Sequence, residues 1–266
     1  MENAVEIGGR EVPFIFERST TSTCRGSYVL THGLGTSKNE YLDFYNRLSE
    51  LLQQQGFNVL RFDFAGHGDA KESGRLFSLI RCFYEADAMT RYLCTELVED
   101  NRVNFFGTSF GAGPAVFAAA SFANTTERVT LLAPAIQYRE LYIEPSSEAR
   151  KTRYQSFLED SLRDGTSIEI DDHVKFGWRN AVEFATINLE HQLSFISDRL
   201  SVFHGSEDEA IPIDLVRPFV QQLQRAKFIE IAGMEHGYTL LGDETGTAPE
   251  SLTNLDVIAS EACRAC

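Results

Sequence analysis

The sequence predicts an α/β fold in which helices cover both faces of a mostly parallel sheet. Short apolar runs, each closing on Gly, Pro or a polar turn, recur along the chain, and helix-length segments separate most of them. Such alternation is typical of parallel sheets, because a parallel connection needs a long crossover. At 266 residues, with 43% hydrophobic and 24% charged residues, the chain can bury its core as one domain.

The first two strands are expected to pair differently. The stretches "AVEIGG" and "EVPFIFER" are joined by Gly8-Gly9, and two glycines between apolar runs indicate a two-residue hairpin. We therefore expect an antiparallel hairpin at the N-terminus, followed by six further strands. Those six are predicted in "SYVLTHG", "FNVLRFDFAG", "RVNFFGTS", "RVTLLAPA", "RLSVFHGS" and "AKFIEIAG".

Six helices are predicted between and after these strands. Their expected ranges are 38–55, 83–99, 110–123, 180–199, 213–224 and 250–263. The interval from 136 to about 198 lacks a clear buried strand, although loops of that length are uncommon in a compact domain unless they carry structure or function. Its aromatic residues indicate an inserted cap, and they either line a substrate pocket or form the cap's own core. Residues 1–266 are thus predicted to form a single domain with a cap at about 136–198.

Composition excludes several classes of protein. The formal charge of −15 argues against a nucleic-acid partner, and no stretch approaches the roughly 18 apolar residues that a membrane span needs. Five scattered cysteines fit reduced thiols, and we interpret Cys263 and Cys266 as two residues at helical spacing rather than a metal or redox site. The N-terminus has no evident signal peptide. We expect a cytoplasmic protein without cofactor or metal, and a homo-oligomer is left open.

One serine, Ser109, lies between two glycines in "FFGTSFGAG". The apolar residues before it predict the end of a buried strand, and the alanine-rich stretch after Pro114 predicts a tightly packed helix. This matches G-x-S-x-G, the turn that exposes a nucleophilic serine between a strand and a helix. Gly107 and Gly111 are expected where a Cβ would collide with neighbouring backbone. Pro114 predicts an irregular first turn in the following helix.

Three other turns follow predicted strands. His32-Gly33-Leu34-Gly35 follows "SYVLT", "HGSEDEAIP" follows "SVF", and "MEHGY" follows "FIEIAG". Because the carboxyl ends of parallel strands share one edge of the sheet, a glycine-rich loop, Ser109, Asp208 and His236 are expected together, in that chain order. Ser, acid, His is the order of the catalytic triad in α/β hydrolases.

These segments give the sequence a resemblance to the α/β hydrolases. It is most similar to bacterial esterases of the cinnamoyl and feruloyl type and to their monoacylglycerol-lipase-like or serine-aminopeptidase-like relatives. The matching segments, within residues 28 to about 238, are "THGLGTSKNEY", "LRFDFAGHGD", "GTSFGAG", "LLAPA", "HGSEDEAIP" and "GMEHGY". The resemblance implies the α/β-hydrolase fold, with a mostly parallel eight-stranded sheet, an N-terminal antiparallel hairpin, helices on both faces and an inserted cap.

The resemblance also implies roles for individual residues. Ser109 is the nucleophile, His236 is the general base and then the general acid, and Asp208 orients the imidazole. The backbone N–H groups of Leu34 and Phe110 form the oxyanion hole, which stabilises the tetrahedral intermediate.

Some assignments stay open at this point. Glu207 and Glu209 flank Asp208 and are alternatives for the acid. We interpret His32, His67 and His204, each beside a glycine in a turn, as structural or hydrogen-bonding residues, while His173 and His191 fall in the cap or its flanking helix. The turn Gly66-His67-Gly68-Asp69-Ala70 departs from the family pattern, in which a serine stands at position 70. The basic run of Arg150, Lys151 and Arg153 is either a solvated helix face or a site for an anionic substrate.

The predicted activity is cleavage of a carboxylic ester by a serine esterase through an acyl-enzyme intermediate. The small-molecule acyl substrate is expected to enter under the cap, which selects the acyl group. A thioesterase, amidase or acyltransferase would use the same acyl-enzyme, and a non-hydrolytic ligand receptor or a lyase on the same fold is an alternative of another class.

Overall fold

An eight-stranded sheet forms the centre of the computed structural model, which describes residues 2–70, 77–145, 148–170 and 174–264. The strand order is β1-β2-β4-β3-β5-β6-β9-β10. The strands are β1 (Glu2–Ile7), β2 (Arg10–Glu17), β3 (Ser27–Thr31), β4 (Asn58–Phe62), β5 (Val103–Thr108), β6 (Thr126–Leu132), β9 (Leu200–Gly205) and β10 (Lys227–Ile231). β2 pairs antiparallel with both β1 and β4, and the other pairs in the sheet are parallel.

The predicted hairpin and strands are confirmed. Gly8 (φ 57°) and Gly9 (φ 76°) both have positive φ, as the central residues of a type I′ turn must. Strands β3 to β6 are almost entirely buried, because helices cover them on both faces. The sequence runs that predicted these strands are largely apolar for the same reason.

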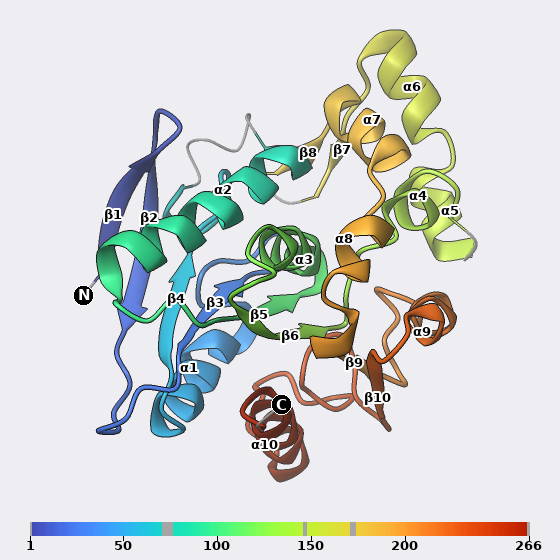
Figure 1. The fold of residues 1–266 in the computed structure, drawn as a ribbon. Coiled ribbons are helices and arrows are strands. Elements are labelled where there is room, and N and C mark those ends of the chain that lie inside the picture. The colour runs from blue at the N-terminus through green and yellow to red at the C-terminus, as the bar shows by residue number, and fades with distance from the viewer. Residues whose placement is uncertain (1, 71–76, 146–147, 171–173, 265–266) are drawn as a thin grey trace.

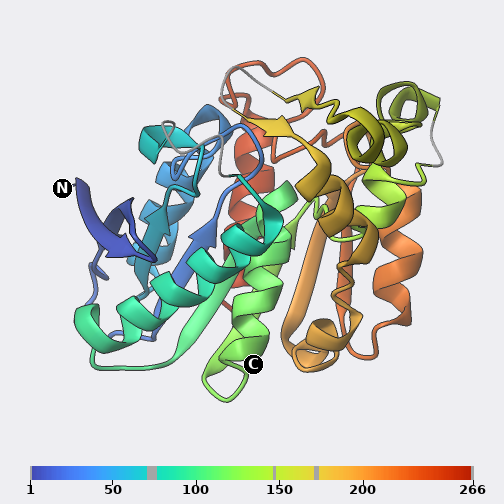
Figure 2. The same ribbon diagram turned by 90° about the horizontal axis from the view of Figure 1, so that it is seen from above.

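Helices enclose the sheet in two layers (Figure 1). The helices of the main body are α1 (Phe44–Gln54), α2 (Leu79–Tyr92), α3 (Ala112–Ser121), α9 (Ile213–Gln222) and α10 (Pro249–Ala262). Buried side chains of α2, α3 and α9 belong to one hydrophobic cluster, and those of α1 and α10 belong to another on the opposite face. Figure 2 shows α2 and α3 side by side across the sheet. The α/β-hydrolase fold predicted from the sequence is thereby confirmed.

Three predicted helix ranges differ clearly from the structure. The helix expected over 83–99 begins earlier, at Leu79, and α2 continues after Tyr92 as the π-helical turn η3 (Leu93–Leu97). The helix expected from residue 38 begins at Phe44, because Glu40, Leu42 and Asp43 have positive φ and form an irregular entry with the 3-10 turn η1 (Tyr41–Asp43). The single helix expected over 180–199 is wrong. Ile187 is extended (φ −80°, ψ 125°) and ends α7, and a second helix, α8, begins at Glu190. In the turn between them, Asn188 Oδ1 accepts a 2.7 Å hydrogen bond from the Glu190 N–H.

The segment between β6 and β9 consists of short elements on the α2 and α3 side of the sheet (Figure 1). They are α4 (Tyr138–Tyr142), α5 (Glu148–Tyr154), α6 (Phe157–Asp164), β7 (Ile168–Glu169), β8 (Lys175–Phe176), α7 (Trp178–Thr186), α8 (Glu190–Ser194) and the 3-10 turn η5 (Ser197–Arg199). β7 and β8 form an antiparallel pair of their own. We call residues 136–198 of this segment the insert.

Aromatic side chains form the core of the insert. Phe184 lies 4.5 Å from Tyr142 and 4.9 Å from Phe176, measured between ring centroids, and all three residues are buried. This core continues to the main body, where Tyr138 of the insert packs 6.1 Å from the ring of Phe110. Of the two interpretations of the aromatic residues, the structure supports a packed core.

Candidate active site

Ser109 stands on a strained turn at the carboxyl end of β5. Its φ is +50°, which is uncommon outside glycine and typical of functional sites. Gly107 and Gly111 lie where predicted: a Cβ on Gly111 would sit 2.0 Å from the Thr31 carbonyl oxygen, and one on Gly107 would sit 2.7 Å from the Ala112 Cα. The 3-10 turn η4 (Ser109–Gly111) precedes α3, so the predicted irregularity is also present.

The structure brings Ser109, His236 and Asp208 together in one chain of hydrogen bonds. Ser109 Oγ lies 2.9 Å from His236 Nε2, and His236 Nδ1 lies 2.9 Å from Asp208 Oδ2. The three residues follow β5, β10 and β9, whose carboxyl ends share one edge of the sheet. Asp208 accepts the Nδ1 hydrogen, which leaves Nε2 free to accept the proton of the serine hydroxyl.

Asp208 is distinguished from its acidic neighbours by burial and by its contacts. Its side chain is fully buried, and Oδ1 accepts 2.9 Å hydrogen bonds from the backbone N–H groups of Ala210 and Ile211. Glu207 and Glu209 are exposed. Of these three carboxylates, Asp208 is therefore the one held against the imidazole.

Two other histidines have structural contacts. Burial lowers the pKa of His32 well below its usual value, and its neutral ring donates from Nδ1 to Gly33 O (2.8 Å) while Nε2 accepts from the Phe64 N–H (3.1 Å). His204 is buried, and its Nε2 lies 2.9 Å from Ile211 O, so it supports the loop that carries Asp208. Burial also lowers the pKa of His204.

The structure describes two of the three remaining histidines. His67 is buried with Nδ1 3.1 Å from Ala65 O, and His191 is exposed, with its ring 4.8 Å from that of Phe195. His173 lies outside the described residues.

Leu34 and Phe110 flank Ser109 from two loops. Leu34 follows β3 and lines the same pocket as Ser109. Phe110 is the second residue of η4, and the backbone N–H groups at the start of a helical turn have no hydrogen-bond acceptor within that turn. The Phe110 side chain does not line this pocket, because it packs in the aromatic core beside Phe77, at 5.5 Å between ring centroids. Phe110 can therefore contribute to the site through its backbone.

The pocket that contains Ser109 and His236 has a volume of about 260 Å³ and is mostly apolar. It is lined by Gly33, Leu34, Thr36, Glu40, Tyr41, Phe44, Thr108, Ser109, His236, Gly237, Tyr238 and Thr239. None of these residues belongs to the insert. The loop before α1 and the loop after β10 thus form the walls of this pocket, with the stacked rings of Phe44 and Tyr238 between them.

An acidic groove of about 490 Å³ adjoins this pocket and shares Tyr41, His236 and Thr239 with it. Five carboxylates line the groove, from Glu207, Glu209, Glu235, Asp243 and Glu244. Because the described lining contains no lysine or arginine, the groove attracts cations.

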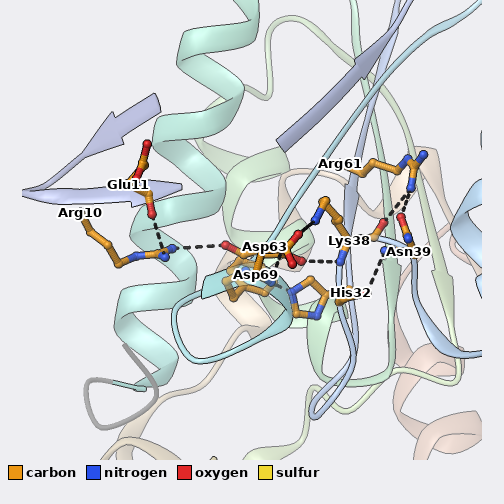
Figure 3. A network of polar contacts seen from close by, with 10 residues as sticks. Arg10, Glu11, His32, Lys38, Asn39, Arg61, Asp63 and Asp69 are labelled. Atoms are coloured by element: carbon orange, nitrogen blue, oxygen red, sulfur yellow. Dashed lines mark hydrogen bonds and ion pairs between the residues drawn. The ribbon is translucent and has the colours of Figure 1, made fainter. Parts of the chain in front are cut away.

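A buried ionic network connects the loop before α1 to the turn after β4 (Figure 3). Lys38 Nζ lies 2.9 Å from Asp63 Oδ2 and also pairs with Asp69, and Asp63 accepts from the backbone N–H groups of Lys38 and Asp69. Burial acts to lower the pKa of Lys38, but its hydrogen bonds to both carboxylates outweigh burial and raise it. Sequence analysis missed this network, which here ties down the turn where Ala70 replaces the family's serine.

The basic run on α5 makes contacts within the insert and one with the main body, where Arg150 Nη1 donates a 2.7 Å hydrogen bond to Ala210 O. Arg150 lies over the Tyr142 ring at 5.0 Å and donates to Leu141 O, and Lys151 pairs with Glu148. Arg153 donates to Glu169 O. These contacts support the interpretation as a partly solvated structural face.

Of the two cysteines at the C-terminal end of the sequence, the structure describes Cys263, which is buried. Burial raises the pKa of the Cys263 thiol to about 11, and Cys266 lies outside the described residues. Within the described ranges, no group of three or more His, Cys, Asp or Glu side chains is arranged to hold a metal ion. No helix in those same ranges is long and apolar enough to cross a membrane.

Comparison with known proteins places the chain in a family. Residues 22–162, just over half of the chain, match the family model described as serine aminopeptidase, S33. No curated protein matches the sequence.

Several solved structures share the fold. Est1E from Butyrivibrio proteoclasticus has a TM-score of 0.72 and 17% identity, covering 97% of this chain and 96% of that one. A second Est1E structure holds ferulic acid. The monoacylglycerol lipase of Paleococcus ferrophilus has a TM-score of 0.65 and 19% identity, covering 95% and 100% of the two chains. The esterase domain of a Rhodothermus marinus protein has a TM-score of 0.67 and 17% identity, covering 99% and 98%.

Proposed function

The chain belongs to the serine aminopeptidase family of α/β hydrolases, and from this premise we propose that it is a serine hydrolase that cleaves carboxylic esters. The observation that carries the proposal is the continuous chain of 2.9 Å contacts from Ser109 Oγ through the His236 imidazole to the buried Asp208 carboxylate. Each of the three residues has a distinct role in the two halves of the reaction.

In the first half, Ser109 attacks the ester carbonyl. His236 Nε2 accepts the hydroxyl proton as the oxygen–carbon bond forms, and Asp208 stabilises the resulting imidazolium through Nδ1–H. The carbonyl oxygen becomes an oxyanion, which the N–H groups of Leu34 and Phe110 receive. Collapse of the intermediate expels the alcohol, which takes its proton from His236, and leaves an acyl group on Ser109.

In the second half, water replaces the alcohol. His236 accepts a proton from the water molecule as it attacks the acyl carbonyl, and the same oxyanion donors act again. When the second tetrahedral intermediate collapses, Ser109 leaves as the alcohol with a proton from His236, and the carboxylic acid is released. The enzyme returns to its starting protonation state, so no cofactor is needed.

Support for an ester substrate comes from the pocket and from the neighbours in shape. The pocket beside Ser109 is mostly apolar, which favours the apolar acyl chain of an ester. Est1E and the Rhodothermus domain bear esterase names or titles, and the Paleococcus protein is named a lipase of monoacylglycerols. At 17–19% identity these similarities show a shared fold alone, so the pocket gives the stronger support for an ester substrate.

A second candidate is hydrolysis of an amide next to a free amino group. The acidic groove beside His236 favours it, because five carboxylates there would attract an ammonium. The family model's own description names an aminopeptidase. The same acyl-enzyme chemistry applies, with an amine as the leaving group.

We also propose that the insert acts as a cap. Its aromatic core packs on Phe110, the residue after the nucleophile, and on Phe77. A change in that core should therefore reach the turn that presents Ser109. Shortening Phe157, which packs against Tyr154 and Phe176 in this core, should alter the acyl-chain preference if the cap selects the acyl group. An unchanged preference would argue against selection by the cap.

The experiment that separates these proposals is a paired substrate screen. p-Nitrophenyl esters of increasing acyl length are compared with aminoacyl p-nitroanilides, using the wild-type protein and Ser109→Ala, with circular dichroism to verify the fold. Turnover of esters that Ser109→Ala abolishes supports the esterase, and faster turnover of the anilides supports the amidase. Turnover that survives in Ser109→Ala contradicts both.

A further inference from the structure

Glu40 places a carboxylate in the wall of the reaction pocket, and sequence analysis assigned it no role. It lines the pocket together with Ser109 and His236. An imagined Cβ on Gly33 would be 3.4 Å from both Glu40 carboxylate oxygens and 3.5 Å from Ser109 Cβ, so the carboxylate and the serine face each other across the Gly33 Cα. This position next to the reacting atoms calls for an explanation.

The carboxylate is bound to the backbone of the loop that carries Leu34. Oε2 accepts a 2.6 Å hydrogen bond from the Gly33 N–H, and Oε1 accepts a 3.0 Å hydrogen bond from the Tyr41 N–H. Glu40 itself has a φ of +62°, an unfavourable backbone conformation for a residue with a side chain. The two hydrogen bonds offset that strain, and they fix the Gly33 N–H in one direction.

The next peptide group along the loop is fixed from its other side. The Gly33 carbonyl oxygen accepts from His32 Nδ1–H at 2.8 Å and from Thr36 Oγ1 at 2.9 Å. Because a trans peptide group is planar, its carbonyl and its N–H point in opposite directions. Holding the Gly33 carbonyl therefore aims the Leu34 N–H away from His32 and Thr36, and the described residues offer that N–H no acceptor.

We propose that Glu40 is a positioning residue that, through the Gly33 N–H, holds the Leu34 peptide group in the orientation of an oxyanion donor. This inference rests on the proposed function, since it needs an oxyanion at Ser109. Donors that are oriented before the reaction stabilise the transition state more than donors that must turn during it. Glu40 thereby acts on the rate of the chemical step without forming part of the triad.

The physical requirement is an acceptor oxygen, and variants can separate it from charge and from volume. Glu40→Gln keeps one acceptor oxygen for the Gly33 N–H and removes the charge. Glu40→Met keeps the approximate length and removes both acceptors. Ser37→Ala is a matched control in the same loop, because Ser37 Oγ accepts from the Asn39 N–H and contacts neither Gly33 nor Leu34.

Steady-state kinetics on the best ester should then show a loss in kcat with little change in KM. Loss of one oxyanion donor lowers kcat about 10²–10³-fold, and we expect Glu40→Met to lose about 10–100-fold because the donor is misoriented rather than removed. The kcat of Glu40→Gln should stay within about tenfold of the wild-type value, and the kcat of Ser37→Ala should equal the wild-type value. Thermal unfolding of each variant establishes that the fold is retained.

A transition-state analogue gives a readout that a purely structural role would not change. A boronic acid forms a tetrahedral adduct on a serine and places an oxygen in the oxyanion hole, so its affinity should fall in parallel with kcat across the variants while KM stays constant. Wild-type kcat in Glu40→Met overturns the inference, and so does a Glu40→Gln variant as slow as Glu40→Met. Failure of the proposed function looks different, because the wild type itself would then neither hydrolyse the ester nor bind the boronic acid at Ser109.

Discussion

Replacing Gly111 by alanine tests how closely the nucleophile's turn packs against the loop after β3. The added Cβ would lie 2.0 Å from the Thr31 carbonyl oxygen and 2.4 Å from that of His32. Both obstacles are backbone atoms next to a central strand, so they cannot yield as the end of a flexible side chain can. The turn and the loop must instead move apart.

The expected loss of stability follows from what that separation disturbs. Overpacking a filled site costs about 1–3 kcal/mol. Thr31 Oγ1 donates to Gly111 O at 2.8 Å and Tyr45 Oη donates to Thr31 O at 2.8 Å, and each hydrogen bond contributes about 1 kcal/mol net. The free energy of unfolding should fall by roughly 3–5 kcal/mol. At about 2–4 °C per kcal/mol for a chain of this size, Tm should fall by roughly 10 °C.

Differential scanning calorimetry measures this shift, and Gly177→Ala is the control. A Cβ on Gly177 meets no atom within 4 Å, and the residue stands at the N-cap of α7, where alanine costs about 1 kcal/mol or less relative to glycine. We also expect kcat to fall in Gly111→Ala, because Ser109 and Leu34 are carried apart. Equal Tm values for the two variants would refute the packing argument.

Three further changes test other parts of the account. Asp208→Asn keeps an oxygen for the two backbone N–H groups but presents an amide to the imidazole; ester hydrolysis should lose about 10⁴-fold in kcat, and an equal loss in Glu209→Gln would contradict the assignment. Lys38→Met leaves a carboxylate buried without its partner, so urea unfolding should show a loss of about 3–5 kcal/mol, against at most about 1 kcal/mol for Lys151→Met in an exposed pair. The Ser251 hydroxyl of α10 donates a hydrogen bond to Asp243, and this bond, together with hydrogen bonds from the loop that contains Asp243, lowers the pKa of Asp243 to about 2. Because this folded-state pKa lies below the unfolded value, the stabilisation is present above pH 4 and is lost as the pH falls through about 2. Asp243→Asn should therefore lower Tm at pH 7 and match the wild type near pH 2, and parallel Tm curves at all pH values would show that the carboxylate contributes nothing.

Local constraints explain why the sequence predicted much of the fold and of the site. Gly107 is required by contacts within the turn itself, and the spacing G-x-S-x-G could be recognised in a single stretch of the chain, although the contacts that require Gly111 come from Thr31 and His32. Chain order alone then placed Asp208 and His236 at the same edge, because parallel strands end together. Short, largely apolar runs indicated the buried strands, because helices cover both faces of the sheet.

The features that sequence analysis missed depend on backbone conformation or on contacts between distant segments. Glu40 reaches Gly33 through a backbone with positive φ, and no pattern of residue types marks that conformation outside glycine. Lys38 gains its partners from the turn after β4, which lies 25 and 31 residues further along the chain. The break at Ile187 depends on extended backbone between α7 and α8, which the apolar periodicity of 180–199 does not indicate.

Mass spectrometry of the trapped acyl-enzyme tests the central claim most directly. The protein is mixed with a rapidly acylating ester, quenched in acid within the first turnover and digested, and a fluorophosphonate probe is used in parallel. We predict one equivalent of acyl group and one equivalent of phosphonyl group, both on the peptide that contains Ser109, and neither adduct in Ser109→Ala. A stoichiometric adduct on any other residue, or steady turnover of the ester in Ser109→Ala, would contradict the assignment of Ser109 as the nucleophile.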